Sequence, residues 1–256
     1  PTSAAAAAAA AVEAKRLFPS LLELDLSCNH LTGPIPSFLP PPFKAQRKKG
    51  KTSRKAQAPS GLRRLCLAGN ALTGGLPWGL GGFGALKELD LSGNRLTGPV
   101  PPWVCGLSRL EVLDLSNNNL TGPLPTKLNA RSTPKLARLC LQFNKLTGPV
   151  ADSGLGTLGA SLAVLNLSHN ALTGRVPENV SNLNKLQVLL MHGNQGLLLC
   201  PMPSGLTCLT KLVDMSLIDS EPSQALPAPR RFDKRRFDTI RAKGKAHGFS
   251  SWEGPG

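Results

Sequence analysis

Two pairs of residues have the types and the spacing that acid–base or metal chemistry requires. Asp90 and Asp114 occupy the same place in two neighbouring copies of a repeated pattern, which puts their backbones about 5 Å apart where the copies pair as strands. On the open face of such a sheet we expect both carboxylates to be solvated, so that nothing separates their pKa values for catalysis. His169 and His192 are expected on adjacent strands with Asn166 nearby, but a third metal ligand is missing. We therefore expect no catalytic residue, no cofactor and no metal site, and the chain is not predicted to be an enzyme.

The pattern that places these residues ends in an asparagine. The motif L-x-x-L-x-L-x-x-N occurs seven times, with Met191 in place of the third leucine in the last copy. Its final residues, here called the Asn ladder, are Asn29, Asn70, Asn94, Asn118, Asn144, Asn170 and Asn194. Alternating leucines are typical of a strand with one buried face. Stacked copies of the motif predict a parallel sheet backed by a continuous leucine core. The ladder amides are expected to bond backbone groups of neighbouring turns that burial would otherwise leave without partners.

The rest of each copy predicts a returning segment on the opposite, convex side. Six of the seven Asn residues are followed by x-Leu-Thr-Gly, in which glycine permits a backbone conformation closed to other residues. A second apolar residue falls ten positions after several ladder residues and predicts a helical or 3₁₀ turn. These residues are Leu39, Leu80, Val104, Leu128 and Val180.

Three segments fall outside the repeats, which we place at residues 17–220 with a degenerate half-copy at the end. Residues 1–16 are Ala-rich, and residues 221–256 form a basic tail. Two ladder residues, Asn29 and Asn70, are 41 positions apart where the other neighbours are 24 or 26 apart, which locates an insertion at about residues 40–58. Its composition predicts disorder. The sequence contains no run of 18 apolar residues, so no membrane span is predicted within it.

The net charge of +15 is concentrated in that insertion and in the tail. Residues 44–55 hold seven Lys and Arg and no acidic residue, and residues 230–245 hold eight Lys and Arg against two acidic residues. This leaves 15 of the 30 basic and 13 of the 15 acidic residues for the rest of the chain. Clustered basic residues can contact a polyanion such as nucleic acid, although most such runs are solvated.

The repeats resemble the plant-type leucine-rich-repeat family, whose consensus is nearly spelled out in LLELDLSCNHLTGPIP, residues 21–36. The family includes the extracellular regions of receptor-like kinases, receptor-like proteins and polygalacturonase-inhibiting proteins. The resemblance covers residues 17–217 and implies an α/β repeat solenoid: a right-handed superhelix with a parallel sheet on the concave face and short helical or 3₁₀ turns on the convex face. It also implies an extracellular or cell-surface location, although the residues themselves leave an intracellular one open. The paired-cysteine cap expected before the first repeat is absent, and so is a kinase domain.

The cysteines and glycosylation motifs add little to this assignment. Cys66 and Cys140 share one strand place three copies apart, about 14 Å at strand spacing, which is too far for a disulfide. The segment HGNQGLLLCPMPSGLTC, residues 192–208, resembles the end of such ectodomains, and this likeness suggests a Cys200–Cys208 disulfide. The N-x-S/T motifs are at Asn119, Asn166 and Asn179.

The concave face is the expected binding surface of this architecture. The side chains that the motif directs toward it are Glu23, Asp25, Arg64, Glu88, Asp90, Val112, Asp114, Arg138, Gln142, Phe143, Asn166, His169 and His192. The Asp residues form either an acidic strip for a ligand or, more simply, part of the L-D-L-S consensus. Phe143 is the best anchor because the chain has few aromatic residues, unless it is partly buried at the rim of the sheet.

Three functional hypotheses remain open. The leading one is a non-catalytic module that recognises a protein, peptide or carbohydrate ligand through the concave face, as a receptor-like or inhibitor-like protein. The second is an ectodomain fragment of a leucine-rich-repeat receptor-like kinase. The third is an intracellular basic scaffold that contacts nucleic acid through residues 44–55 and 230–245.

Overall fold

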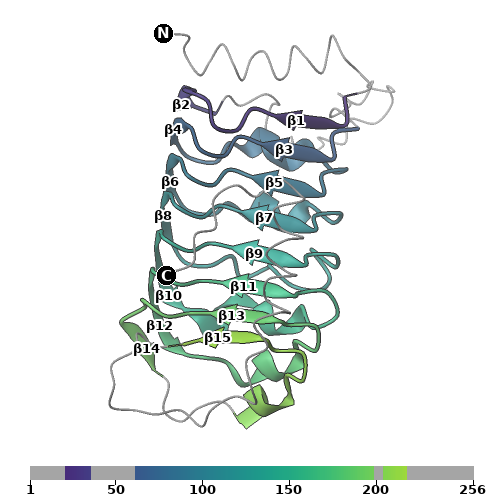
Figure 1. Ribbon diagram of the computed structural model, residues 1–256, viewed down its shortest axis with the longest axis vertical. Coiled ribbons are helices and arrows are strands. Elements are labelled where there is room, and N and C mark those ends of the chain that lie inside the picture. The colour runs from purple at the N-terminus through teal and green to yellow at the C-terminus, as the bar shows by residue number, and fades with distance from the viewer. Residues whose placement is uncertain (1–20, 36–60, 199–203, 218–256) are drawn as a thin grey trace, which may run out of the picture.

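Residues 21–35, 61–198 and 204–217 are described by a computed structural model, and they form a curved stack of similar turns (Figure 1). Each complete turn contains a strand, a second strand and a segment that returns across the outside of the stack. The Ala-rich segment, the basic insertion, the basic tail and Cys200 lie outside the described residues, so the predictions for them stay predictions. Within the described ranges no helix has the length and the hydrophobicity of a membrane span.

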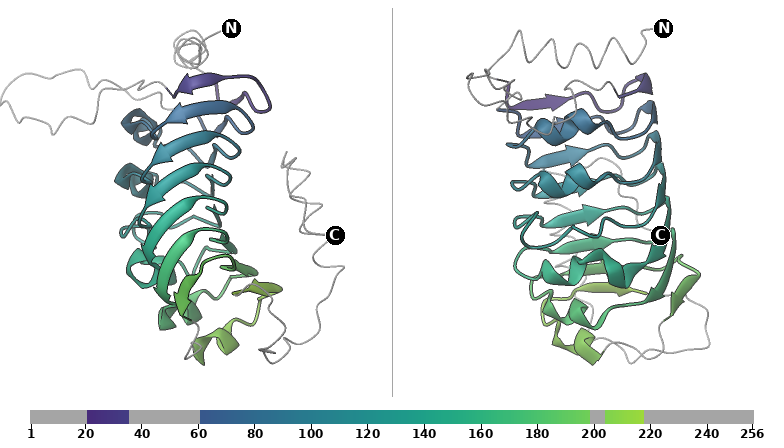
Figure 2. Two further views of the ribbon diagram at one scale, coloured as in Figure 1. Left: turned by 90° about the vertical axis from the view of Figure 1, so that its left-hand side faces the viewer. Right: turned by 180° about the vertical axis from the view of Figure 1, so that it is seen from behind.

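The first strands of all turns form one parallel sheet of eight strands, here called the concave sheet. In order along the sheet they are β1 (Glu23–Asp25), β3 (Arg64–Cys66), β5 (Glu88–Asp90), β7 (Val112–Asp114), β9 (Arg138–Cys140), β11 (Val164–Asn166), β13 (Val188–Leu190) and β15 (Asp214–Ser216). The sheet lines the inner side of the curve, as predicted (Figure 2). β1 pairs directly with β3, so the concave sheet continues without a break although the insertion separates the two strands in sequence.

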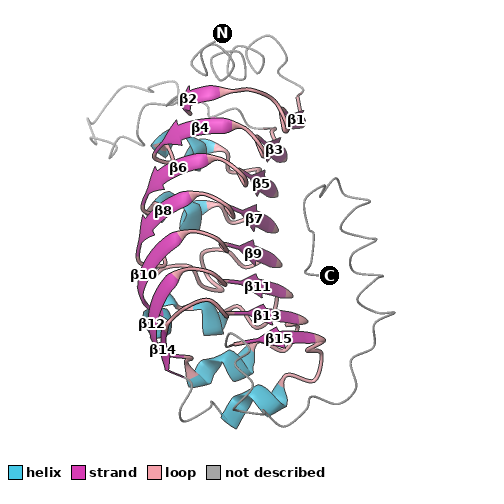
Figure 3. Cartoon of the chain, turned by 60° about the vertical axis from the view of Figure 1, so that its left-hand side comes forward, coloured by secondary structure: helices cyan, strands magenta, loops and turns pink. Residues whose placement is uncertain are grey.

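The second strands form a parallel sheet of seven strands that the sequence analysis did not anticipate (Figure 3). They are β2 (Thr32–Pro34), β4 (Ala71–Gly74), β6 (Arg95–Gly98), β8 (Asn119–Gly122), β10 (Lys145–Pro149), β12 (Ala171–Arg175) and β14 (Gly196–Leu198). The Leu-Thr-Gly segments make the first six of these strands, and β14 comes from the last copy, which lacks that segment. Their leucines point into the core, where Leu96, Leu120 and Leu172 are fully buried, and their backbones pair between neighbouring turns.

Six short 3₁₀ helices lie on the outer, convex side among the described residues. They are η1 (Trp78–Gly82), η2 (Pro102–Gly106), η3 (Val150–Ser153), η4 (Leu155–Thr157), η5 (Glu178–Asn182) and η6 (Ser204–Cys208). Leu80, Val104 and Val180 are buried at the centres of η1, η2 and η5, so the predicted turns of the convex side are confirmed. Leu128 is buried as well, but it lies in a turn without a helix.

The Asn ladder joins each turn to the one before it. The Asn118 side chain accepts a hydrogen bond from the Leu96 N–H and donates to the Leu91 carbonyl, both 3.0 Å away in the preceding turn. It also donates to the carbonyls of Leu115 and Ser116 in its own turn. The same pair of bonds to the preceding turn recurs at Asn70, Asn94, Asn144, Asn170 and Asn194. The ladder therefore gives partners to backbone groups inside the stack that the sheets do not pair.

The first ladder residue differs, and this difference provides a matched control. Asn29 is exposed and, among the described residues, its side chain donates to the Leu26 and Ser27 carbonyls of its own turn and bonds to no preceding turn. We expect Asn118→Ala to lower the free energy of unfolding by about 2–4 kcal/mol, because it leaves a buried N–H and buried carbonyls without partners. We expect Asn29→Ala to lower it by less than about 1 kcal/mol. Urea unfolding followed by circular dichroism measures both, and equal losses would contradict the role of the bonds between turns.

Candidate ligand-binding surface

The motif directs two places of each concave strand away from the leucine core, and the side chains at these two places differ in their exposure to solvent. At the first place Glu23 is exposed, and the next five residues along the sheet are partly exposed. These are Arg64, Glu88, Val112, Arg138 and Val164. At the second place Asp90, Asp114 and Asn166 are only 7%, 8% and 6% exposed. The expectation that the two Asp carboxylates are solvated is therefore wrong.

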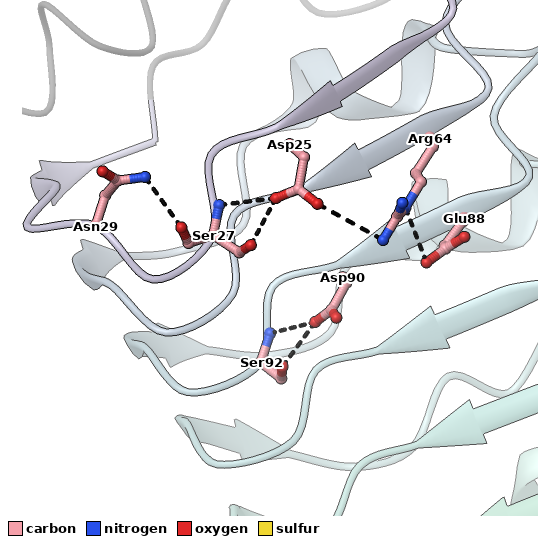
Figure 4. A network of polar contacts seen from close by, with 7 residues as sticks. All are labelled: Asp25, Ser27, Asn29, Arg64, Glu88, Asp90 and Ser92. Carbon is pink, nitrogen blue, oxygen red and sulfur yellow. Dashed lines mark hydrogen bonds and ion pairs between the residues drawn. The ribbon is translucent and has the colours of Figure 1, made fainter. Parts of the chain in front are cut away.

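These buried side chains complete the turn that follows each strand. Asp114 Oδ1 accepts hydrogen bonds from the Ser116 N–H at 3.0 Å and from the Ser116 hydroxyl at 2.6 Å. Asp90 makes the same pair of bonds with Ser92 (Figure 4), and Asn166 makes it with Ser168. The geometry favours the consensus interpretation of L-D-L-S over an acidic strip that is free to meet a ligand.

Burial also changes the acidity of one of these carboxyls. Asp90 and Asp114 are register partners on β5 and β7. Desolvation, followed by the nearby Asp90 charge, raises the pKa of Asp114 to about 6, against the opposing effects of the Ser116 hydrogen bonds and of Arg138. At the end of the sheet the Ser27 hydroxyl and N–H lower the pKa of the exposed Asp25. Asp114 and Asp25 hold equivalent places in the repeat, yet the pKa of Asp114 lies above its ordinary value and the pKa of Asp25 lies below it.

Three predicted binding residues form an ion network across the first three concave strands (Figure 4). Arg64 on β3 lies between Asp25 on β1, with 3.6 Å between Nη2 and Oδ2, and Glu88 on β5, with 3.2 Å between Nε and Oε1. Burial lowers the pKa of Arg64, but the Glu88 and Asp25 charges outweigh this effect and the net shift is upward. The Arg64 guanidinium is therefore already held by carboxylates of this chain.

The residue before each ladder Asn has a left-handed backbone in all seven copies, and we call it the left-handed place. Its φ angle lies between 51° and 70° at Cys28, Gly69, Gly93, Asn117, Phe143, His169 and Gly193. Glycine and asparagine adopt this conformation readily, whereas a bulky residue there costs about 1 kcal/mol or more. Sequence reasoning missed this constraint, although the two Gly residues and the Asn in copies two to four, with Gly193 in copy seven, were a usable signal.

Phe143 and His169 therefore occupy a place that disfavours them, and they form an aromatic row with His192. The Phe143 and His169 rings stack with centroids 4.3 Å apart and planes 9° apart. The His192 ring meets His169 edge-on at 4.9 Å. A Cβ added to Gly193 would lie 2.6 Å from His169 Nδ1, so Gly193 makes room for that ring. Phe143 is 51% exposed, which leaves much of its ring open to a ligand.

The other predicted site residues divide by burial. Gln142 is 8% exposed and does not present its side chain at the surface. Asn166 is only 6% exposed, so its amide nitrogen is closed to a glycan in the folded repeat, whereas Asn119 and Asn179 are exposed. Across the residues that the structure describes, no three His, Cys, Asp or Glu side chains are grouped closely enough to hold a metal ion.

The cysteines of the described repeats are thiols. Cys66 and Cys140 lie on β3 and β9, three strands apart in the sheet, as predicted. Burial raises the pKa of Cys66 to about 11 and raises that of Cys140 well above its ordinary value. Both are therefore protonated and unreactive at neutral pH.

The pKa values of Asp114 and Asp25 shift in opposite directions, so removing each charge is predicted to have an opposite effect on the free energy of unfolding. A raised folded-state pKa means that the Asp114 contribution to stability is present below its ordinary value of 3.8 and is lost as the pH rises to about 6. Asn166 makes the same Ser bonds without a charge, so we expect Asp114→Asn to raise the free energy of unfolding at pH 7 by about 1–3 kcal/mol, with little effect near pH 4.

Asp25→Asn is the control for this prediction. Its carboxyl has a lowered pKa, so its contribution is present above the ordinary value and is lost as the pH falls through the folded-state value. We expect the Asn variant to be no more stable than the parent at pH 7. Urea unfolding of both variants across this pH range gives the comparison, and a destabilised Asp114→Asn at pH 7 would contradict the effect of burial.

Comparison with known proteins agrees with this geometry. Residues 60–120 match a family model described as leucine rich repeat, and residues 20–41 and 161–183 match a second model of the same description. No curated protein sequence matches the chain.

Several solved structures are similar to the chain. The ectodomain of the Arabidopsis thaliana receptor kinase GASSHO1/SCHENGEN3, solved with CASPARIAN STRIP INTEGRITY FACTOR 2, is 34% identical with a TM-score of 0.63, over 78% of this chain and 22% of that one. The Arabidopsis receptor kinase HAESA, solved with the peptide hormone IDA and the co-receptor SERK1, is 26% identical with a TM-score of 0.64, over 78% of this chain and 30% of that one.

A plant ice-binding protein is also similar, at 25% identity and a TM-score of 0.58, over 78% of this chain and 57% of that one. One fold thus serves different functions, and function has to be argued from the site. The chain spans less than a third of the length of these two receptor chains. The repeats, the sheets and these matches show that the chain belongs to the leucine-rich-repeat proteins and resembles the ectodomains of plant receptor kinases.

Proposed function

We propose that the chain is an extracellular recognition module that binds a peptide across its concave sheet. The similar receptor ectodomains support the ligand class, because HAESA was solved with a peptide hormone. The aromatic row supports the position. Its strained residues do not serve the repeat itself, since three of the seven copies have glycine at the left-handed place.

The single observation that carries the proposal is the exposed ring of Phe143 on the rim of the concave sheet. A phenyl ring that is 51% exposed in a left-handed backbone is unfavourable for folding alone. Large aromatic side chains are frequent anchors of binding energy. On the concave strands, the partly exposed Val112, Arg138 and Val164 are register partners on β7, β9 and β11, and a ligand can lie across them.

Selection from a displayed library of random linear peptides tests the proposal. We expect the folded chain to enrich peptides that share a sequence motif, and we expect Phe143→Asn to weaken their binding at least about tenfold, as loss of an aromatic anchor does. Trp78→Ala is the matched control, because Trp78 is also 51% exposed but begins η1 on the convex side. It should leave binding unchanged.

Phe143→Asn is designed to preserve the fold. Asn117 adopts φ 53° at the equivalent place of the preceding repeat, so asparagine fits the backbone there. Relief of about 1 kcal/mol of strain offsets the loss of a ring stack worth about 0.5–1.5 kcal/mol. Urea unfolding should place the variant within about 1 kcal/mol of the parent. Enriched peptides that bind Phe143→Asn as tightly as the parent, or that depend on Trp78, would contradict the proposed surface.

A further inference from the structure

We infer that the exposed end of the aromatic row binds the guanidinium group of an arginine in the peptide ligand. This inference rests on the proposed function and names the chemical group that the Phe143 ring recognises. Its evidence is the direction of the side chains at the left-handed place, the fixed plane of the ring, the charge of the concave sheet and a buried acceptor beside Phe143.

Side chains at the left-handed place lean toward the preceding repeat. A Cβ added to Gly69 would contact Cys28, one added to Gly93 would contact Gly69, and one added to Gly193 would contact His169. His169 correspondingly stacks on Phe143 of the repeat before it. The Phe143 ring therefore ends the row on the side of the exposed Asn117, beyond which come two glycines. A ligand group has room to lie against the ring there without displacing a large side chain.

The ring that meets the ligand is held in a fixed plane. The planes of the Phe143 and His169 rings are 9° apart, and His169 is itself packed between the edge of His192 and the backbone at Gly193. Because ordering a side chain on binding costs free energy, a ring that is already ordered favours a partner that can stack flat on it. The guanidinium of arginine is planar and stacks on aromatic faces, whereas the ammonium of lysine is a compact point charge.

The charge of the concave sheet favours a cation. Its described strands contain six carboxylates, at Glu23, Asp25, Glu88, Asp90, Asp114 and Asp214, and two guanidiniums, at Arg64 and Arg138. Arg64 is already paired with two of these carboxylates. The excess of negative charge lowers the energy of a ligand cation on this side of the stack, and a cation over a phenyl face gains about 0.5–2 kcal/mol in addition.

Gln142, which precedes Phe143 in the chain, supplies the remaining feature. Its side-chain oxygen is buried and accepts no hydrogen bond from the residues that the structure describes. A buried acceptor without a donor is costly, so an N–H group of the ligand would stabilise this oxygen once the Gln142 side chain turns out toward the surface. Among the side chains of a peptide, the guanidinium alone combines a flat face, a permanent positive charge and five N–H donors.

The experiment uses a peptide enriched on the full chain by the library selection, together with two synthetic copies of it. One copy has citrulline in place of arginine, which keeps the planar shape and loses the charge, and the other has lysine, which keeps the charge and loses the plane. We expect each replacement to weaken binding to the parent chain about tenfold, measured by isothermal titration calorimetry. On Phe143→Asn the same replacements should weaken binding by less than about threefold, because the ring that distinguishes them is absent.

Phe143→Leu provides a second variant, since it keeps an apolar side chain but removes the aromatic face. It should behave as Phe143→Asn does toward the three peptides. Trp78→Ala should behave as the parent chain does. If the enriched peptides lack arginine, or if the citrulline and lysine copies lose the same affinity on Phe143→Asn and Phe143→Leu as on the parent, the inference is wrong while the proposed function stands. If the selection enriches no peptide, both fall.

Discussion

The hydrogen bonds of the Asn ladder are the interaction on which the rest of this structure depends. Each turn leaves backbone N–H and carbonyl groups inside the stack, where water cannot reach them. One asparagine amide serves groups of two successive turns, as Asn118 does with Leu96, Leu91 and Leu115. The ladder therefore fixes the spacing of the turns, and both sheets and the leucine core form around that spacing. The residues near each ladder asparagine are therefore restricted in backbone conformation and in side-chain type.

Two positions near each ladder asparagine show this restriction, and a departure from it at the second position is a sign of function. Where a described concave strand ends in an acidic or amide side chain, that side chain bonds to a serine two residues later, and Asp90, Asp114 and Asn166 are buried in this arrangement. The residue before the asparagine needs a positive φ, which glycine satisfies without strain. A bulky residue there is a departure that folding alone does not require. Phe143 and His169 make that departure in consecutive repeats, and their rings stack.

Much of the fold could be predicted from the sequence because the repeat is regular. Alternating leucines predicted the concave sheet, and the second apolar place predicted the convex turns at Leu80, Val104 and Val180. The second sheet was missed because each Leu-Thr-Gly segment contains one buried residue, too few to show a strand period. The burial of Asp90 and Asp114 was missed because strand alternation places a side chain on a face without revealing its hydrogen bonds. The strain at Phe143 was missed because it depends on a dihedral angle, which the glycines of the other repeats indicate only indirectly.

Hydroxyl-radical footprinting of the chain with an enriched peptide tests the central claim that the aromatic row is the ligand-binding end of the concave sheet. The reactive side chains of Phe143, which follows the concave strand β9, and of Trp78, which begins η1 on the convex side, are equally exposed. Mass spectrometry gives the oxidation rate of each residue with and without the peptide. We expect the peptide to slow the oxidation of Phe143 and His169 and to leave that of Trp78 unchanged. Protection of Trp78 with no change at Phe143 would contradict the account.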